Sequence, residues 1–387
     1  MVVIEAGSLF VGDDKNYPMR VRRCSLIKKR VVLVARDIAP SACFKRLVEV
    51  LEKQETETVL IVGNGLPLKE TLEEISLAVS TADVVILGMS STAELAEVEV
   101  SAGETARRLG IPYGFYGDCA RCWARARAGA WFESLAPGAQ FYFGVTQADA
   151  EASQEVFPNA RLVGTGNPLR EDMFFPRFSR EEVRTKLGLG MEKKLVLAHG
   201  GKFAAGNMVS WVVLVEALSI LAKDGHNFQL ILSLHPGDRT PEAVDRGNET
   251  KMNLYEELVS YSPIPTTIVR RGDELTTSDL IAGADIIVGF GGSPEVEGAC
   301  QNIPVISLSF EVLAQKIERE CGRRVFETVD FGTAELVVAD ATKLAERMRS
   351  LLTSEGFALM AYRQREVYPK PTERGAAIAK MAKFLGL

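Results

Sequence analysis

The sequence predicts an α/β protein of two domains, each a doubly wound parallel sheet, which face each other across a cleft. Its 387 residues exceed one ordinary hydrophobic core and suit two domains of about 150–200 residues each. Short apolar segments rich in β-branched residues alternate with longer amphipathic segments, as parallel strands alternate with crossover helices. This alternation stops over residues 167–194, where Pro168, Pro176 and scattered charges indicate a hinge, and then begins again.

The first half contains six segments with the composition of strands. The predicted strands are 30–35, 58–62, 83–87, 112–116, 141–145 and 161–164. The predicted helices between them are 42–53, 69–80, 94–109 and 147–156. Strands that alternate with helices in this way lie parallel, with helices on both faces of the sheet. Residues 1–168 are therefore expected to form the first doubly wound domain.

The second half, residues 169–371, repeats the pattern and is expected to form the second domain. Its predicted strands are 194–198, 229–234, 266–269, 285–288 and 304–307. Helices are predicted over 208–224, from the spacing of its apolar residues, and over 341–353, with Asp340 as N-cap. Ligands of such sheets bind at the carboxyl ends of the strands, so we expect those ends to face the cleft.

Composition and charge exclude several classes of function. With 47% hydrophobic and 25% charged residues, the chain has the composition of a soluble globular protein, and its net charge of −6 argues against a general nucleic-acid binder. No apolar run reaches the length of about 18 residues that a membrane span needs, and the N-terminus does not resemble a signal peptide, so we expect a cytoplasmic location. A basic cluster before the first strand is either a solvated edge or a surface that attracts an anionic acceptor or membrane. It comprises Arg20, Arg22, Arg23, Lys28, Lys29 and Arg30.

The cysteines are expected to be thiols, because a large cytosolic chain rarely carries a disulfide framework. There are six: Cys24, Cys43, Cys119, Cys122, Cys300 and Cys321. Cys119 and Cys122 form a C-x-x-C pair, but a structural zinc ion needs a second pair or nearby histidines, which the neighbouring sequence lacks. We therefore expect no metal site and interpret the pair as a coincidence at the start of a helix, with metal or redox use as the alternative.

The segment 284–307 contains the strongest candidate for a ligand site. An apolar strand ends at Gly289, and a turn with Gly291 and Gly292 leads to Ser293, which can cap a helix that has Pro294 in its first position. Free N–H groups and the helix dipole at such a start bind diphosphates, and glycines let the phosphate approach the main chain. A capped strand-turn-helix without a ligand would show the same residue types.

This segment resembles the nucleotide-sugar segment of GT-B glycosyltransferases and non-hydrolysing UDP-N-acetylglucosamine 2-epimerases. In those proteins an acidic residue follows a glycine-rich turn, and a proline follows seven positions later, as Pro304 follows Glu297 here. The resemblance implies the GT-B fold, with two Rossmann-like domains facing across a cleft, and a nucleotide-sugar ligand. It also implies that Glu297 holds the ribose hydroxyls, whereas Glu295 in the first helical turn is explained by the helix dipole without a ligand.

Three further segments resemble the same proteins in the same order. Residues 163–169 resemble the run that closes their first domain, and 232–237 resemble a second-domain strand that ends in His-Pro. Residues 370–379 resemble the start of their last helix, which crosses back onto the first domain. The resemblance therefore implies that a C-terminal helix within 372–387 packs on the first domain.

Other residues of the second domain are candidates for the same ligand. Gly200, Gly201 and Lys202 follow its first strand and could form the other wall of the diphosphate site, with Lys202 neutralising charge on the leaving group. His235 ends a neighbouring strand, and Arg270 follows a third in the region where these families place the base. The alternatives are a solvated loop, a hydrogen-bonded histidine and a solvated arginine.

The two enzyme classes make different demands on the first domain. The epimerases need acidic residues after its third and fourth strands. Here residues 88–92 contain none and 115–119 offer Asp118 alone, which argues against an epimerase. An inverting transferase needs one base that deprotonates the acceptor hydroxyl. Asp118 is the first candidate for that base and Asp37, after the first strand, is the second, although each could instead serve the fold.

The resemblance thus implies a metal-independent glycosyltransferase that uses a UDP-sugar and no cofactor. Its acceptor would be a glycan or a lipid-linked molecule, which would allow peripheral association with a membrane. Two alternatives remain: an enzyme similar to the 2-epimerases, and a non-catalytic protein that binds a nucleotide sugar or glycan. The second alternative stays open because residues 35–41, after the first strand, lack a glycine-rich loop.

Overall fold

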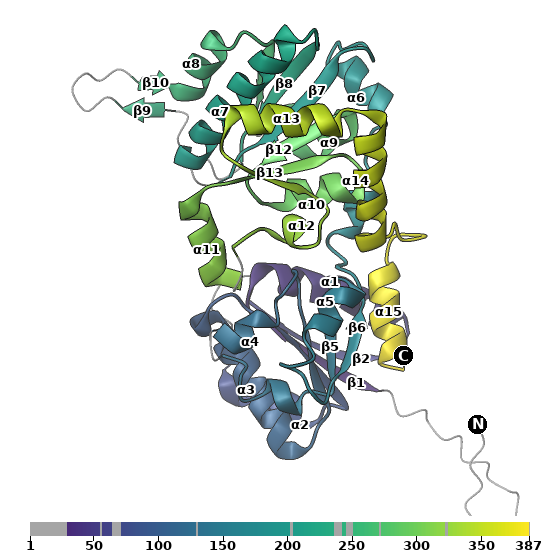
Figure 1. Cartoon of the computed structure of the whole chain (residues 1–387). Coiled ribbons are helices and arrows are strands. Elements are labelled where there is room, and N and C mark those ends of the chain that lie inside the picture. Colours follow the sequence, from purple (N-terminus) through teal and green to yellow (C-terminus); the bar gives the residue numbers. More distant parts are fainter. Residues whose placement is uncertain are drawn as a thin grey trace, which may run out of the picture.

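Two six-stranded parallel sheets, one in each domain, form the framework of the protein (Figure 1). The strand order is β2-β1-β3-β4-β5-β6 in the first sheet and β11-β8-β7-β12-β13-β14 in the second. These sheets confirm the predicted fold class. The computed structural model describes residues 29–54, 56–63, 71–128, 131–201, 204–235, 242–244, 251–270, 272–321 and 324–386.

The strands of the first domain agree with the predicted ranges to within one residue. They are β1 (Arg30–Ala35), β2 (Glu57–Val62), β3 (Val84–Gly88), β4 (Tyr113–Tyr116), β5 (Phe141–Gly144) and β6 (Arg161–Gly164). The helices are α1 (Ile38–Lys53), α2 (Leu72–Ser80), α3 (Ala93–Leu109), α4 (Ala124–Ala128) and α5 (Gln147–Ala152). Helix α1 begins four residues before the predicted range because Asp37 caps it and its first turn tolerates Pro40.

The second domain has one more strand in its sheet than the sequence predicts. The strands are β7 (Lys194–His199), β8 (Phe228–Ser233), β11 (Thr266–Val269), β12 (Ile286–Gly289), β13 (Val305–Ser309) and the additional edge strand β14 (Glu335–Val338). A separate antiparallel ribbon pairs β9 (Glu242–Val244) with β10 (Lys251–Asn253). The helices are α6 (Arg180–Lys186), α7 (Ala204–Lys223), α8 (Leu254–Tyr261), α9 (Thr277–Gly283), α10 (Ser293–Cys300), α11 (Glu311–Cys321), α12 (Glu327–Asp330), α13 (Ala341–Leu351) and α14 (Ser354–Val367). Asp340 caps α13 as predicted, accepting the N–H of Lys343 at 2.8 Å.

Alternate side chains of the central strands pack into cores on the two faces of each sheet. In β1, Val32 and Val34 belong to one core, whereas Val31 and Leu33 belong to the other. Burial on both faces explains why the strands are continuous apolar runs. The final helix, α15 (Ala376–Phe384), lies beside α1 of the first domain and adds to its core (Figure 1).

Helix α7 departs from the expectation that no segment is apolar enough to span a membrane. Its residues Gly206–Lys223 meet the length and hydropathy of a span, and half of them are buried. Trp211, Leu214 and Leu218 are at most 1% exposed and pack into the core of the second domain. The core accounts for the apolar character of this helix.

The basic cluster predicted before β1 lies mostly outside the described residues. Lys29 and Arg30 are described. The Lys29 ammonium donates to the backbone oxygen of Leu385, just after α15, and Arg30 pairs with Glu57 at 3.2 Å. These two cations therefore make contacts within the first domain and with the C-terminal segment.

Candidate functional site

Both sheets reverse their strand order at one point, and at such a point a crevice opens outside the carboxyl ends of two adjacent strands. In the second sheet the reversal lies between β7 and β12, since the chain continues from β7 to β8 and β11 on one side and from β12 to β13 and β14 on the other. In the first sheet it lies between β1 and β3. The segments that follow these four strands contain most of the predicted site residues.

The turn after β12 has the backbone that a close approach of phosphate requires. Gly291 has φ of 101° and Gly292 has φ of 136°, which side chains other than glycine rarely tolerate. Gly292 is the N-cap of α10, and no side chain caps this helix. The prediction that Ser293 is the cap, with Pro294 first in the helix, is wrong: Ser293 is an exposed first residue and Pro294 is second. A helix start without a side-chain cap leaves its N–H groups to an anion.

The Glu295 side chain holds this turn in place through hydrogen bonds. Its role is therefore more than a favourable interaction with the helix dipole. Its carboxylate is fully buried, and Oε1 accepts the N–H of Gly291 at 2.7 Å. The hydroxyl of Thr328 on α12 donates to Oε2 at 2.8 Å. Glu295 therefore fixes the glycine turn from inside and ties it to α12.

His199, at the end of β7, packs beneath the glycine turn. It is 2% exposed, and its Nε2 lies 3.6 Å from Oε1 of Glu295. Neither ring nitrogen makes a hydrogen bond to a described residue. A buried polar ring that makes no hydrogen bond to the described residues, beside a predicted diphosphate site, can serve a ligand. The sequence alone gave this residue no role, because it reads as the end of a core strand.

Gly289 must lack a side chain because of His199. A Cβ at position 289 would lie 1.9 Å from Nε2 of His199. We expect Gly289→Ala to lower the free energy of unfolding by about 1–3 kcal/mol, the usual cost of overpacking a core. Urea unfolding measures this loss, and His199→Ala in the same protein should remove most of it. An equal loss in both backgrounds would show that the clash is not with His199.

The turn after β7 is held by a buried amide. Asn207 of α7 accepts the N–H of Gly201 at 2.8 Å and donates to the Gly201 oxygen at 3.0 Å. A Cβ at Gly200 would lie 3.1 Å from the same amide oxygen, so the two glycines pass close to the helix. Lys202, predicted to neutralise the leaving group, lies outside the described residues.

The two remaining donor-site candidates follow strands on one side of β7. His235 comes two residues after β8 and is half-buried. Arg270 follows β11, its N–H donates to Asp273 at 2.8 Å, and its exposed guanidinium pairs with Glu256 of α8 at 2.7 Å. Within the described chain, no hydrogen bond joins Arg270 to the glycine turns or to Glu297, so its place in the site stays a prediction.

Glu297 lies in the second turn of α10 and is 8% exposed. The Ser278 hydroxyl, from the first turn of α9, donates to its Oε2 at 2.9 Å. Burial raises the pKa of Glu297 to about 7, against the lowering effect of the Ser278 bond. Its hydrogen bond to the described chain uses Oε2, which leaves Oε1 for a ligand hydroxyl.

This raised pKa predicts a pH-dependent cost to stability. The ordinary pKa is 4.5, so between about pH 4.5 and 7 the folded protein holds a proton that the unfolded chain has released, and stability falls as pH rises. Glu297→Gln should match the parent below this window and exceed its unfolding free energy above it, by about 2–3 kcal/mol. Urea unfolding of both proteins from pH 4.5 to 8.5 tests this, and the difference isolates Glu297 from other buried acids. A difference independent of pH would contradict the assignment.

Asp37 caps α1 and has little capacity left as a base. Its Oδ1 accepts the N–H of Ile38 at 2.8 Å, and its Oδ2 accepts that of Ser91 at 3.0 Å. Burial raises the pKa of Asp37, but the hydrogen bonds from Ser91 and Ile38 outweigh it and lower the pKa overall. A carboxylate with both oxygens occupied and a lowered pKa is a weak proton acceptor.

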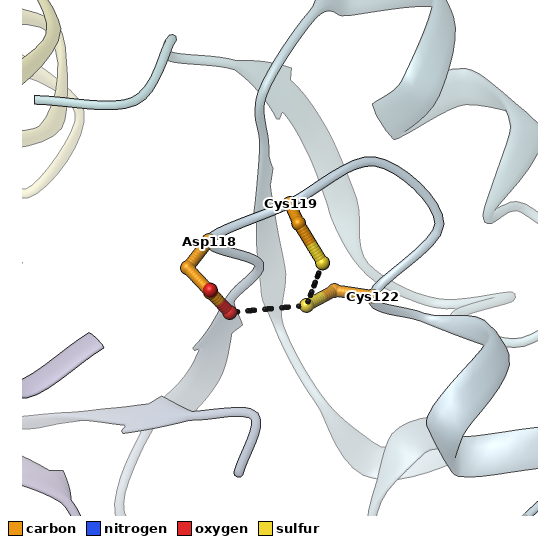
Figure 2. Close-up of side chains that lie close together, drawn as sticks. All are labelled: Asp118, Cys119 and Cys122. Carbon is orange, nitrogen blue, oxygen red and sulfur yellow. Dashed lines mark hydrogen bonds between the residues drawn. The ribbon is translucent and has the colours of Figure 1, made fainter. Parts of the chain in front are cut away.

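Asp118 follows β4, and Figure 2 shows its carboxylate beside two thiols from the same loop. The Cys122 thiol donates to Oδ1 of Asp118 at 3.2 Å, and Arg125 lies 3.5 Å from the same oxygen. Arg125 also donates to the Met89 oxygen, just after β3. Arg125 thus links the ends of β3 and β4 at the acceptor side of the predicted cleft.

The sequence did not single out Glu99, which lies within α3 beneath Ser90, the second residue after β3. Glu99 is fully buried, accepts the Ser90 hydroxyl and accepts the Arg36 N–H at 3.3 Å. Burial raises its pKa to about 7, and its Oε2 has no hydrogen-bond partner among the described residues. Ser90 in turn accepts the N–H of Asp37 at 3.1 Å. Ser90 thus connects Asp37 to a buried carboxylate that can accept a proton. Glu99 lies in the middle of α3, where the sequence pattern does not distinguish it from other helical glutamates.

The loop after β4 also contacts the second domain. The Ala120 N–H donates to Glu327 of α12 at 3.2 Å, and Arg121 pairs with Asp330 of the same helix at 3.0 Å. Arg170, in the segment between the domains, pairs with Glu327. In Figure 1, α10 and α12 lie on the side of the second domain next to the first. Helix α12 therefore connects the acceptor side to Glu295 and the glycine turn.

The comparison with known proteins agrees with this architecture. No family model matches the chain. One curated relative, the UDP-N-acetylglucosamine–N-acetylmuramyl-(pentapeptide) pyrophosphoryl-undecaprenol N-acetylglucosamine transferase of Caldanaerobacter subterraneus, is 33% identical over 141 residues. That match covers 34% of this chain and 37% of the relative, so the similarity spans little more than a third of the relative's length.

Solved structures match nearly the whole chain. A protein from Listeria monocytogenes assigned as a UDP-N-acetylglucosamine 2-epimerase has a TM-score of 0.58 at 14% identity, covering 93% of this chain and 98% of its own. MurG of Acinetobacter baumannii has a TM-score of 0.54 at 16% identity, covering 92% and 99%. MnaA of S. aureus, solved with UDP, has a TM-score of 0.54 at 14% identity, covering 93% and 97%. With its two facing parallel sheets, the chain is a GT-B-fold protein, of the fold that these glycosyltransferases and epimerases share.

Proposed function

We propose that the protein is a glycosyltransferase that moves a sugar from a UDP-sugar to an acceptor hydroxyl. The observation that carries this proposal is the set of residues that follow β7 and β12, the two strands at which the order of the second sheet reverses. A glycine turn follows each strand, the turn after β12 leads into the uncapped start of α10, and Glu297 lies buried in the second turn of that helix. The N–H groups of α10 would hold the diphosphate, and the Oε1 of Glu297 would accept hydrogen bonds from the ribose.

In the proposed reaction the acceptor oxygen attacks the anomeric carbon of the sugar, and the bond from that carbon to the UDP oxygen breaks. The glycine turns and the helix dipole stabilise the negative charge that develops on the departing UDP, without a cofactor. Asp118 is the proposed base, because its two described side-chain contacts both use Oδ1 and leave Oδ2 for the acceptor proton. Asp37 is less suited, since both its oxygens accept backbone N–H groups.

The relatives support the donor and suggest the acceptor. The curated relative is by name an N-acetylglucosamine transferase that acts on a pyrophosphoryl-undecaprenol compound, and the S. aureus protein was solved with UDP. We therefore propose UDP-N-acetylglucosamine as the first donor to test, and a lipid-linked or other glycan acceptor. Cytoplasmic location, with peripheral association at a membrane, belongs to the same proposal.

The first domain argues against the epimerase alternative. The position after β3 is occupied by Ser90 and Ser91, and Asp118 is the acid after β4. Deprotonation and elimination at the sugar ring need more acids than this. Glu99 is buried beneath Ser90 and does not substitute for a residue on the crevice surface.

Incubation with UDP-N-acetylglucosamine, or UDP-glucose, and a lipid-linked acceptor tests the proposal. We expect release of UDP that depends on the acceptor, together with a product heavier by one sugar. Inversion at C2 without UDP release would overturn it in favour of an epimerase. Tight UDP binding with neither reaction across a panel of glycan and lipid-linked acceptors would overturn it in favour of a binding protein.

A further inference from the structure

Three potential metal ligands converge in the loop after β4, at the edge of the first domain that meets α12. Asp118, Cys119 and Cys122 each offer one donor atom, and all three atoms lie within 4.8 Å of one another (Figure 2). The sequence showed the two cysteines without a second pair. The fold supplies a carboxylate as the third donor.

The distances suit a zinc ion. Tetrahedral ligands at Zn–S distances of about 2.3 Å and a Zn–O distance of about 2.0 Å lie about 3.5–3.8 Å apart. The sulfurs of Cys119 and Cys122 are 3.4 Å apart, and Cys122 Sγ is 3.2 Å from Oδ1 of Asp118. Both separations are about 0.3–0.4 Å shorter than in such a site, and the Cys119 sulfur lies within 4.8 Å of the Asp118 carboxylate, so small shifts would admit the ion.

A buried tyrosine hydroxyl without a described hydrogen bond lies next to the cluster. Tyr142 is fully buried, and its hydroxyl has no hydrogen-bond partner among the described residues. A Cβ at Gly117 would lie 2.4 Å from that hydroxyl and 2.9 Å from the Cβ of Cys122, so the phenol and this cysteine border the same small space. A phenol there can donate to a zinc-bound thiolate, as the outer partners of metal ligands commonly do.

The charges also balance. Two thiolates and one carboxylate carry three negative charges, and a divalent ion with the nearby Arg125 guanidinium carries three positive ones. The Nη2 of Arg125 lies 3.7 Å from the Cys119 sulfur and its Nη1 lies 3.5 Å from Asp118. Thiolate sulfur selects zinc over the harder magnesium and calcium ions.

We propose that Asp118, Cys119 and Cys122 bind a zinc ion through three protein ligands, with the fourth position open to water. Binding displaces one proton from each thiol and makes no change in oxidation state. Asp118 coordinates through Oδ1, so its Oδ2 stays free for the acceptor. The ion fixes the loop in which Ala120 and Arg121 contact α12. The proposal does not rest on glycosyl transfer, because zinc binding is measured without turnover.

The test is the zinc content of the full chain, stripped with a chelator, reloaded with one equivalent of Zn²⁺ under a non-chelating reductant and desalted. We expect about one zinc per chain in the parent and in Cys43→Ala, which removes a buried thiol elsewhere. Cys119→Ser and Cys122→Ser should lose stoichiometric zinc, and Tyr142→Phe should bind it about tenfold more weakly. With cobalt in place of zinc, the parent should show thiolate charge-transfer absorption that both serine variants lack.

Two results would overturn the proposal. One is a parent protein that retains no zinc while its circular dichroism shows it folded, as would follow if the pair forms a disulfide or a plain thiol contact. The other is zinc retained at full stoichiometry in both serine variants. Loss of transferase activity with zinc binding intact would count against the proposed function alone, so the two failures are distinguishable.

Discussion

Replacing Glu297 with alanine should weaken UDP binding by about 1–3 kcal/mol, or about 5- to 150-fold in Kd, without unfolding the protein. The free Oε1 of Glu297 would accept charge-assisted bonds from the ribose, and alanine removes them. The fold should survive because the buried carboxylate is costly to ionise, and alanine removes this cost.

The measurement is calorimetric titration with UDP at pH 8, where the carboxylate is ionised. Glu346→Ala, which removes an exposed glutamate from α13, is the matched control and should bind UDP as the parent does. For the parent, affinity should fall between pH 8 and 6 as Glu297 takes up a proton. Glu297→Gln should fall less over that range, by the amount due to protonation of the terminal phosphate of UDP alone. Unchanged UDP affinity in a folded Glu297→Ala protein would sink the ribose assignment.

Most of the fold was predictable because it depends on local patterns. The strands of the parallel sheets are buried on both faces, so they stand out as continuous apolar runs such as 31–35, and nearly all were found. The missed edge strand β14 has exposed residues, Leu336 and Val338 among them, and so lacks that signal. Helix α1 was predicted to begin at residue 42, whereas it begins at Ile38, since a proline is tolerated in the first turn of a helix.

The donor site was partly predictable. Glycines at a strand end and the step from Glu297 to Pro304 are visible in the sequence, whereas the roles of His199 and Glu295 depend on contacts between distant segments. Ser293 was taken as the cap from its residue type, yet the backbone places Gly292 there with φ of 136°. Cap identity depends on where the turn ends, which the residue types alone do not reveal.

The acceptor side was less predictable, because its chemistry is built from tertiary contacts. Glu99 lies mid-helix, and nothing in its neighbours signals a buried carboxylate whose pKa is raised to about 7. The pairing of Asp118 with two thiols depends on how the loop after β4 folds back. Asp37 was a candidate base because it follows a strand, but in the structure its side chain caps α1.

The ion pair that joins Arg170, in the segment between the domains, to Glu327 of α12 should be the most costly contact at the domain junction to break. The Glu327 side chain is 2% exposed and that of Arg170 is 19% exposed, and Nη2 of Arg170 is 3.5 Å from Oε2 of Glu327 in addition to the closer contact of Nη1 with Oε1. Arg170→Met would leave a buried carboxylate with the Ala120 N–H as its remaining described hydrogen bond. We expect a loss of about 3–5 kcal/mol in unfolding free energy.

The same variant should also weaken UDP binding, although no contact among the described residues joins Arg170 to a predicted ligand residue. Thr328 follows Glu327 in α12, and its hydroxyl donates a hydrogen bond to the Glu295 carboxylate. The same carboxylate accepts the N–H of Gly291. A movement of α12 would therefore be passed to the glycine turn through these two hydrogen bonds. Urea unfolding and UDP titration measure the two effects. The double variant Arg170→Met/Glu327→Leu, which buries no unpaired charge, should recover most of the stability. Recovery of stability without recovery of UDP affinity would show that the ion pair positions α12 for the donor site. A single variant as stable as the parent would contradict the role of the pair in fixing α12 to the segment between the domains.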